Sequence, residues 1–255
     1  MHFDDNQIER YARHFILDEI GPAGQAKIIN SKVLVVGAGG LGSPILLYLA
    51  AAGVGTIGII DDDRVALSNL QRQIIHDENS IDSKKTESVV SSLSALNPDV
   101  NIIPFTKKLD KTNAKEIISN FDIVADGSDN FDTRFLVNDT AYLCKRILVS
   151  GAVHKFDGQI STFKAFEKGD NPCYRCLHPE PPPEDSIPSC AEGGILGSIP
   201  GIIGCLQATE ILKEITGAGE GLSGKLLIYD ALRTNFRKIL IRPDPSCKLC
   251  GKQKS

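Results

Sequence analysis

The stretch VLVVGAGGLGSPILLYLAAAGVGTIGIIDDD, from Val33 to Asp63, decides the fold class. It runs from a short apolar segment through a glycine-rich turn into a longer apolar segment, and it ends on a second short apolar segment followed by acids. Two short apolar runs that flank a helical segment are typical of a β-α-β unit with parallel strands. The stretch therefore predicts an α/β protein.

The glycine turn and the acid that follows it together indicate a nucleotide site. Gly37, Gly39 and Gly42 form the pattern G-x-G-x-x-G between the first strand and the helix, where bare backbone amides and the helix dipole favour an anion. Asp61 ends the second strand, the position from which a carboxylate can hydrogen-bond ribose hydroxyls. These features fit NAD and ATP equally well, so they leave the nucleotide open.

The alternation of short apolar runs and helical segments continues along the chain. We expect strands at residues 33–36, 56–60, 101–105, 123–125 and 147–150, and helices at 41–52, 84–96, 113–119 and 131–143. Farther on, GQISTF (158–163) and KLLIYD (225–230) are predicted as antiparallel strands, and 201–216 as a late helix. The expected fold class is α/β, with a Rossmann-like, doubly wound, mostly parallel sheet that continues into antiparallel strands.

The composition excludes several classes of protein. With 255 residues, of which 42% are hydrophobic and 24% charged, the chain is long and apolar enough for a globular core. The net charge of -4, with both signs interspersed, leaves no basic stripe for nucleic acid. The N-terminus is polar, and the apolar runs are interrupted well before the ~18 residues that a membrane span needs. We therefore expect a cytoplasmic protein that binds neither nucleic acid nor a membrane.

Further polar residues follow the strands that are expected to share the carboxyl edge of the sheet. Lys85 opens a helix, Asp129 and Asn130 follow the strand at 123–125, and the segment SNLQRQ contains Ser68, Asn69, Leu70, Gln71 and Arg72. In a doubly wound sheet these side chains converge. Arg72 and Lys85 would then offset the charge of a triphosphate, and Asp129 could hold Mg²⁺. The alternative is that Arg72 and Lys85 are solvated surface charges.

Two C-x-x-C motifs indicate a metal site. The chain has seven cysteines and no export signal, which argues for metal or thiol chemistry over a disulfide framework. Cys173 with Cys176 and Cys247 with Cys250 form two C-x-x-C pairs, which fit a structural tetrahedral zinc knuckle that clamps the C-terminus to the middle of the chain. The alternative is a set of redox pairs.

The other cysteines and a nearby histidine are interpreted separately. Cys144 and Cys205 lie in apolar helical stretches and are expected to be packing residues. We expect His178 to be a solvated loop residue and not a metal ligand. The segment HPEPPPEDSIPSCAEGG (178–194) is rich in proline and acids, so we expect an exposed, mobile loop. Burial does not explain Cys190 in such a loop.

Taken in order, these motifs resemble the ThiF/MoeB/HesA family, which is related to the adenylation core of ubiquitin-activating enzymes. The resemblance covers nearly the whole chain, from RYARHFIL (10–17) through VLVVGAGGLG, SNLQRQ, GSDN, SGAVHKFDGQI and PCYRCL to CKLCG. It implies a single adenylation domain over residues 1–255. The domain would have an N-terminal helical arm (1–30), a nucleotide-binding half (31–151) and a half for the carrier and the zinc (152–255).

The resemblance implies an ATP- and Mg²⁺-dependent enzyme that adenylylates the C-terminal glycine of a ubiquitin-like sulfur carrier. The carrier would be of the MoaD or ThiS type and end in Gly-Gly, in molybdopterin or thiamine biosynthesis or both. By position, Gly40 would lie under the phosphates, Asp61 would bind the ribose, and Asp129 would ligate magnesium. Asn69, Arg72 and Lys85 would hold the triphosphate. Arg13 would reach the ATP of the opposite subunit in a homodimer.

Several alternatives stay open at this point. In some members of the family a cysteine at the position of Cys190 bonds covalently to the carrier, and in others it is not needed for adenylylation. The chain ends at Ser255 without the rhodanese-like domain that some relatives carry, so sulfur is expected from a separate sulfurtransferase or cysteine desulfurase. Other possible functions are a Rossmann-type NAD-dependent oxidoreductase and adenylylation of a different peptide or small-molecule carboxylate.

Overall fold

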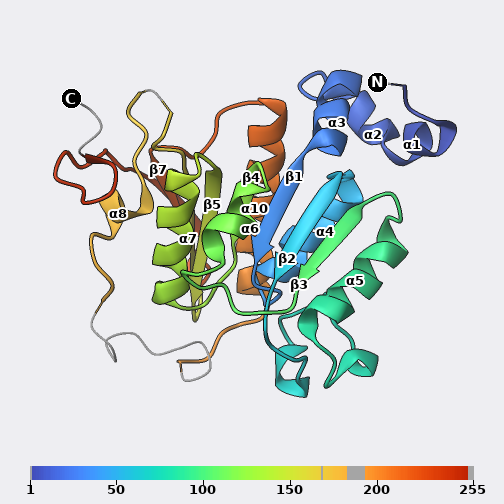
Figure 1. Cartoon of the computed structure of the whole chain (residues 1–255), viewed down its shortest axis with the longest axis horizontal. Coiled ribbons are helices and arrows are strands. Elements are labelled where there is room, and N and C mark those ends of the chain that lie inside the picture. Colours follow the sequence, from blue (N-terminus) through green and yellow to red (C-terminus); the bar gives the residue numbers. More distant parts are fainter. Residues whose placement is uncertain (1, 168, 183–192, 252–255) are drawn as a thin grey trace.

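The computed structural model of the protein describes residues 2–167, 169–182 and 193–251, and an eight-stranded sheet forms its centre. The strands lie in the order β3-β2-β1-β4-β5-β6-β7-β8 (Figure 1). Pairing is parallel from β3 to β5 and antiparallel from β5 to β8. The strands are β1 Lys32–Val36, β2 Thr56–Ile60, β3 Asn101–Phe105, β4 Ile123–Asp126, β5 Ile147–His154, β6 Asp157–Phe163, β7 Lys225–Asp230 and β8 Asn235–Leu240. The predicted fold class is confirmed.

Helices cover both faces of this sheet. They are α1 Asp5–Arg10, α2 Ala12–Phe15, α3 Gly21–Asn30, α4 Gly42–Ala52, α5 Lys85–Leu96, α6 Ala114–Ser119, α7 Phe131–Leu143, α8 Tyr174–Leu177 and α10 Ser198–Thr216. Short 3₁₀ helices lie at Leu67–Asn69 and Glu78–Ser80. In Figure 1 the N-terminal helices lie at one end of the molecule, and the C-terminal segment lies at the other, beside α8.

Strand β1 illustrates how the sequence produces two cores. Successive side chains of a strand point to opposite faces of the sheet. Val33 and Val35 belong to the apolar core that α3, α4, α5 and α10 cover, whereas Leu34 and Val36 belong to the core under α6 and α7. All four side chains are buried, which is why the strand reads as an uninterrupted apolar run.

Strand β8 was not predicted from the sequence. It pairs only with β7, at the edge of the sheet, and all six of its residues are exposed. An edge strand with both faces exposed has no buried face to impose an alternating apolar pattern. The hydrophobic periodicity that locates the other strands is therefore missing here.

Helix α10 begins at Ser198, earlier than the predicted start at residue 201. The helix thus includes Pro200 in its first turn, which tolerates proline because the N–H there has no partner within the helix. The residue before the helix, Gly197, lies so close to the SNLQRQ turn that a Cβ on it would be 2.1 Å from the carbonyl oxygen of Gln71. This contact places the start of α10 beside that turn.

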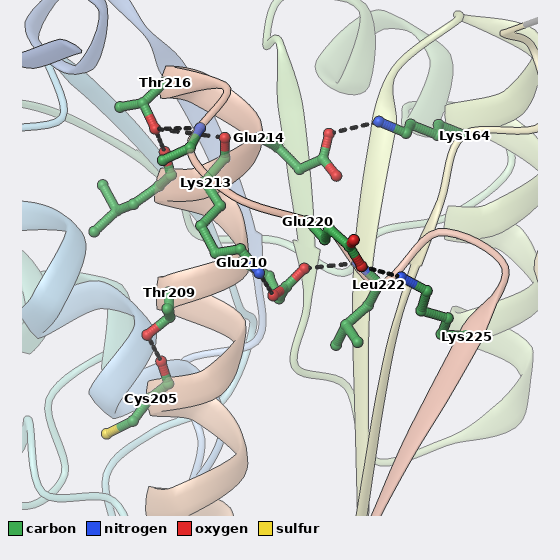
Figure 2. A network of polar contacts seen from close by, with 12 residues as sticks. Lys164, Cys205, Thr209, Glu210, Lys213, Glu214, Thr216, Glu220, Leu222 and Lys225 are labelled. Atoms are coloured by element: carbon green, nitrogen blue, oxygen red, sulfur yellow. Dashed lines mark hydrogen bonds and ion pairs between the residues drawn. The ribbon is translucent and has the colours of Figure 1, made fainter. Parts of the chain in front are cut away.

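Carboxylates on the C-terminal half of α10 attach the helix to the antiparallel strands (Figure 2). Oε2 of Glu210 accepts a hydrogen bond from the backbone N–H of Leu222 at 2.9 Å, and its Oε1 pairs with Lys213. One turn later, Glu214 pairs with Nζ of Lys164 at 2.9 Å. The side chains of both glutamates are 8% exposed, so the helix has buried charges that are compensated by these partners.

Candidate active site at the switch point of the sheet

The candidate site lies where the chain changes direction within the sheet, between β1 and β4. The chain passes outward from β1 through β2 to β3 and then returns to the other side of β1 as β4. The loops that follow β1 and β4 therefore run apart, and such a switch point forms a crevice at the carboxyl ends of the strands.

Glycines allow the two loops to touch at the base of this crevice. The N–H of Gly127 donates to the carbonyl of Val36 at 2.9 Å. Gly37 has φ of +92°, and a Cβ on it would lie 3.1 Å from the carbonyl oxygen of Gly127. A Cβ on Gly42 would lie 1.9 Å from the carbonyl oxygen of Gly37. Gly42 is therefore required by packing between the turn and the start of α4.

Two side chains hold the peptide of Ala38 in the glycine turn. Oδ2 of Asp61 accepts a hydrogen bond from the Ala38 N–H at 2.8 Å, and its Oδ1 accepts from the N–H of Asp63 at 2.8 Å. Nε2 of His76 lies 3.0 Å from the Ala38 carbonyl oxygen, and its Nδ1 lies 2.8 Å from Oγ of Ser88. The carbonyl can only accept, so the imidazole donates from Nε2.

The role of Asp61 is thus wider than expected, because its carboxylate braces the glycine turn. Ribose binding by Asp61 stays a prediction. His76 was not singled out from the sequence, where a lone histidine after SNLQRQ gives no signal of its contact with Ala38. Burial lowers the pKa of His76, and the nearby Lys85 adds to this effect against the Ala38 hydrogen bond and the charges of Asp61 and Asp77.

A cavity of about 380 Å³ occupies the crevice. Its wall includes eight residues that the sequence had indicated: Gly37, Gly39, Gly40, Asp61, Arg72, Lys85, Asp129 and Asn130. These residues come from separate loops that the parallel sheet brings together at one edge, as its topology predicts. The interpretation of Arg72 and Lys85 as isolated surface charges is therefore not supported.

The cations of the wall are held in place by the surrounding chain. Lys85 is 5% exposed as the first residue of α5, and its Nζ lies 2.7 Å from Oδ2 of Asp63. Arg72 is half-buried and donates from Nη1 to the carbonyl of Ser68 at 3.1 Å. Lys107 and Lys108 also line the cavity. The sequence signal for them was available, since they follow the predicted strand at 101–105.

Other predicted site residues lie outside the cavity wall. Oδ1 of Asn69 accepts from the N–H of Ala66 at 3.2 Å and so shapes the 3₁₀ turn that presents Arg72. Ser68, Leu70 and Gln71 belong to this same turn, and neither they nor Gly42 line the cavity. Arg13 is exposed on α2 and also lies outside the wall. Its predicted reach into a second subunit stays a prediction.

The acidic groups of the wall are of two kinds. Carboxylate oxygens of Asp61, Asp62 and Asp63 lie within 4.8 Å of one another and could hold a metal ion. Asp129 is exposed and accepts a hydrogen bond from Nδ2 of Asn130 at 3.4 Å. Oxygen ligands of this type suit Mg²⁺, so the residues present fit that ion.

Arg134 is a further wall residue that sequence reasoning missed. It is 7% exposed on α7 and donates from Nη2 to the Ser128 carbonyl at 2.8 Å. The buried Asp126 fixes this loop, because it accepts from the N–H and the hydroxyl of Ser128 and from the hydroxyl of Ser150. The sequence of a predicted helix does not indicate which residues its arginine will contact after tertiary packing, so Arg134 could not be identified from the sequence.

The four cysteines of the two C-x-x-C pairs form one cluster. Sγ of Cys173 lies 3.9 Å from Sγ of Cys176 and 3.6 Å from Sγ of Cys247. Sγ of Cys176 lies 3.4 Å from Sγ of Cys250. Sulfurs about 2.3 Å from a tetrahedral zinc ion lie about 3.8 Å from one another. The backbone N–H of Asp244 donates to Sγ of Cys176 at 3.4 Å. The cluster can therefore hold a tetrahedral metal ion.

The thiols of the cluster differ in acidity. The hydrogen bond to Cys176, together with burial, raises the pKa of Cys173, and burial raises that of Cys250 to about 12. The hydrogen bond from Cys173 lowers the pKa of Cys176 to about 5. Neighbouring thiols thus stabilise one thiolate, whereas a full set of thiolates requires a cation.

The structure corrects the expectation for His178 and bears on the remaining cysteines. His178 is half-buried against Tyr174, with ring centroids 4.8 Å apart, and is not a solvated loop residue. It is not a member of the cysteine cluster. Cys144 packs against the core beneath α7, as predicted, and Cys205 is half-buried on α10. Cys190 and most of the predicted mobile loop lie outside the described residues.

No sequence stretch in the described parts of the chain forms a helix both long and apolar enough to cross a membrane.

Comparisons with known proteins identify the family of the chain. The ThiF family model matches residues 11–249. The chain is 47% identical over 248 residues to a SAMP-activating enzyme E1 of Haloferax volcanii, covering 97% of this chain and 90% of the relative. It is 46% identical over 253 residues to a sulfur carrier protein adenylyltransferase of Thermus thermophilus, covering 98% and 93%.

Among solved structures, E. coli MccB with MccA-N7isoASN is similar, with a TM-score of 0.84 at 20% identity, over 97% of this chain and 76% of that one. At this identity the likeness shows the fold alone. The family model spans residues 11–249, and the two relatives match over 97% and 98% of the chain. The chain therefore belongs to the ThiF family and is an enzyme of the adenylyltransferase class.

Proposed function

We propose that this protein uses ATP to adenylylate the C-terminal glycine carboxylate of a ubiquitin-like sulfur carrier that ends in Gly-Gly. The observation that carries the proposal is the cavity at the switch point, whose wall combines the glycine turn with Arg72, Lys85, Lys107 and Lys108. A triphosphate carries more negative charge than the pyrophosphate of NAD, so a wall with these four cations suits ATP better. The names of the two relatives support a protein carrier as the acceptor.

The proposed reaction is a displacement at the α-phosphorus of ATP. A carboxylate oxygen of the carrier bonds to that phosphorus, the bond to the oxygen bridging to the β-phosphate breaks, and pyrophosphate leaves with the electron pair. Both reactants are anions, so the enzyme acts mainly by positioning and by charge stabilisation from Arg72 and Lys85. Side-chain nucleophiles are not required for this step.

The glycine turn would allow the phosphates to approach the backbone closely. A Cβ on Gly40 would lie 3.1 Å from the ring of Pro200 and 3.5 Å from Cγ of Arg72. A side chain there would crowd the cavity wall next to the proposed phosphate-binding arginine. Asp129 would hold Mg²⁺, which offsets negative charge on phosphate oxygens when it is bound.

Zinc in the cysteine cluster is proposed to have a structural role. Four thiolates complete a tetrahedron and leave no position for a substrate. Residues 247–250 would then be tied to Cys173 and Cys176, next to Tyr142 of α7, with which they share an apolar cluster. The zinc would thereby hold the end of the chain against the helix that begins at the active site.

The acceptor would be a MoaD- or ThiS-type carrier, which would place the enzyme in molybdopterin or thiamine biosynthesis. The sulfur would come from a separate sulfurtransferase or cysteine desulfurase. We further propose a homodimer in which Arg13 of each chain completes the other chain's site. The exposed position of Arg13, outside its own cavity wall, supports an action between subunits.

The test of the function is ATP–pyrophosphate exchange with purified carriers. We expect exchange that depends on an intact C-terminal Gly-Gly and that Asp129→Ala abolishes, whereas replacing the exposed neighbour Asp132 by Ala leaves it unchanged. Mass spectrometry should detect the acyl-adenylate and would report any adduct at Cys190. NAD reduction without exchange would instead support an oxidoreductase, and exchange with a short peptide alone would support a different acceptor.

Mixing two inactive variants tests the role of Arg13. If Arg13 acts across the dimer, Arg13→Ala and Lys85→Ala chains should complement each other, because one of the two sites in each hybrid dimer is then intact. Random mixing should restore about a quarter of wild-type exchange. If Arg13 acts within its own chain, the mixture stays inactive.

A further inference from the structure

Arg134 is a buried cation for which the described residues provide no acidic partner. The residue is 7% exposed, and its one hydrogen bond to the backbone goes to the Ser128 carbonyl. Its guanidinium also lies 6.0 Å from the centre of the Phe131 ring and interacts with the side chain of Tyr174. Within the described ranges, no carboxylate oxygen comes within 4.0 Å of the guanidinium nitrogens.

Among the described residues this charge is uncompensated, which is costly unless a ligand supplies an anion. Buried arginines are normally paired, because desolvation of the charge is otherwise uncompensated. Even the half-buried Arg175 of the neighbouring α8 is paired, since its Nη2 lies 2.7 Å from Oδ2 of Asp139. Arg134 differs from it in lining the 380 Å³ cavity. Its unused N–H donors are therefore available for a ligand.

Arg134 also lines a second, smaller crevice, whose wall does not include Arg72 or Lys85. It lines this crevice together with Ala152 and Gln159 of β5 and β6, Leu177 of α8 and Leu226 of β7. Arg134 therefore lies between the nucleotide cavity and the antiparallel half of the sheet. The other cations of the cavity wall follow β2 and β3 or begin α5.

We infer that Arg134 binds the terminal carboxylate of the acceptor and orients it toward the α-phosphorus. The inference rests on the proposed adenylylation and assigns the acceptor end of that same site. The planar fork of a guanidinium matches a carboxylate in two parallel hydrogen bonds. Its position on α7, beside the antiparallel strands, sets it apart from the cations that follow β2 and β3 or begin α5.

A double-mutant cycle between Arg134 and the carboxylate tests this inference. One carrier has its natural C-terminal Gly-Gly carboxylate, and the other has the same sequence with a C-terminal carboxamide. Dissociation constants are measured for both by calorimetry with a non-hydrolysable ATP analogue present. For the wild-type enzyme we expect the carboxamide to weaken binding about tenfold or more, the scale of a lost charge-assisted hydrogen bond. For Arg134→Gln the two carriers should bind within about twofold of each other.

Three controls keep the result interpretable. Arg146→Gln is the matched variant, because Arg146 also donates to a backbone carbonyl, that of Ser119 at 2.8 Å, but does not line the cavity. It should retain the full carboxamide penalty. Arg134→Gln should keep the wild-type affinity for the ATP analogue, which shows that its site is folded. If it does not fold, Arg134→Lys replaces it and should show a reduced penalty, because the charge is kept and the fork is lost.

The outcomes are distinct. An equal carboxamide penalty in the wild type and in the Arg134 variant overturns the inference. A tenfold loss of affinity for the ATP analogue with unchanged carrier binding also overturns it, and assigns Arg134 to a phosphate. Absence of carrier-dependent ATP–pyrophosphate exchange in the wild-type enzyme contradicts the proposed function itself, independently of Arg134.

Discussion

Nζ of Lys85 lies 2.7 Å from Oδ2 of Asp63 and so joins the first residue of α5 to the end of the acidic run after β2. The lysine side chain is 6% exposed, whereas that of the aspartate is 68% exposed. The acids that follow β2 therefore have different roles. Asp61 braces the glycine turn, and Asp63 orients Lys85 in the cavity wall. Asp62 is exposed, and its backbone carbonyl lies 3.5 Å from Nζ of Lys84.

The first prediction concerns this pair. Asp63→Asn preserves the shape of the side chain but removes the charge that orients Lys85 toward the cavity. We expect kcat/KM for ATP in the exchange assay to fall about three- to tenfold. Asp132→Asn removes the same charge from an exposed aspartate outside the cavity wall and is the matched control, for which no change is expected. An equal fall in both variants would mean that only the total charge of the protein matters.

The second prediction follows from the lowered pKa of His76. Burial disfavours the charged imidazole in the folded protein, so the unfolded chain binds a proton more readily below its ordinary pKa of about 6.5. The contribution of neutral His76 to stability is therefore complete above that pH. It is lost progressively as the pH falls from about 6.5 toward the folded-state pKa.

Urea unfolding at pH 5.5, 6.5 and 7.5 measures this effect. The free energy of unfolding of the wild type should fall below pH 6.5 more steeply than that of His76→Gln, whose side chain does not titrate. The variant should also raise KM for ATP, because the Ala38 carbonyl loses its imidazole donor. Parallel pH profiles for the two proteins would show that His76 does not titrate differently on folding.

The contrast between these residues shows which parts of the site can be predicted from the sequence. The β1-α4-β2 unit and Gly37 follow from local signals, namely apolar periodicity and a turn that excludes side chains. Lys85 and Asp129 follow from parallel topology, which brings strand ends to one edge. His76 and Arg134 could not be found in this way, since their contacts with Ala38 and Ser128 depend on how loops and helices pack. Strand β8 was missed because its exposed faces carry no pattern.

The third prediction concerns the buried ion pair between α10 and the strand-end residue Lys164 (Figure 2). Burial lowers the pKa of Lys164, but its hydrogen bonds and charge interactions with Glu214 and Glu167 more than offset that effect and raise it above its ordinary value. Glu214→Gln leaves a partly buried ammonium group with one weaker partner. We expect the free energy of unfolding at pH 7 to fall by about 1–2 kcal/mol, less than for a fully buried pair.

Glu220 provides the control for this measurement. It also pairs with a lysine, Lys225 at 3.0 Å, but its side chain is 86% exposed. Glu220→Gln should therefore leave the unfolding curve unchanged. If the two variants are equally stable, burial of the Glu214 pair does not determine the stability of this region.

The fourth prediction concerns removal of the metal. Purified protein kept reduced should contain about one zinc ion per chain, because the four sulfurs already lie at tetrahedral spacing. A strong chelator should lower the melting temperature, since metal binding offsets the ordering of the C-terminal segment and stabilises the fold by several kcal/mol. Cys247→Ser should lose the zinc and reproduce this loss of stability. Cys205→Ser, which replaces a half-buried thiol of α10 outside the cluster, should retain the metal. Reversible disulfides within the cluster, in protein that contains no metal when isolated, would instead identify the cysteines as redox pairs.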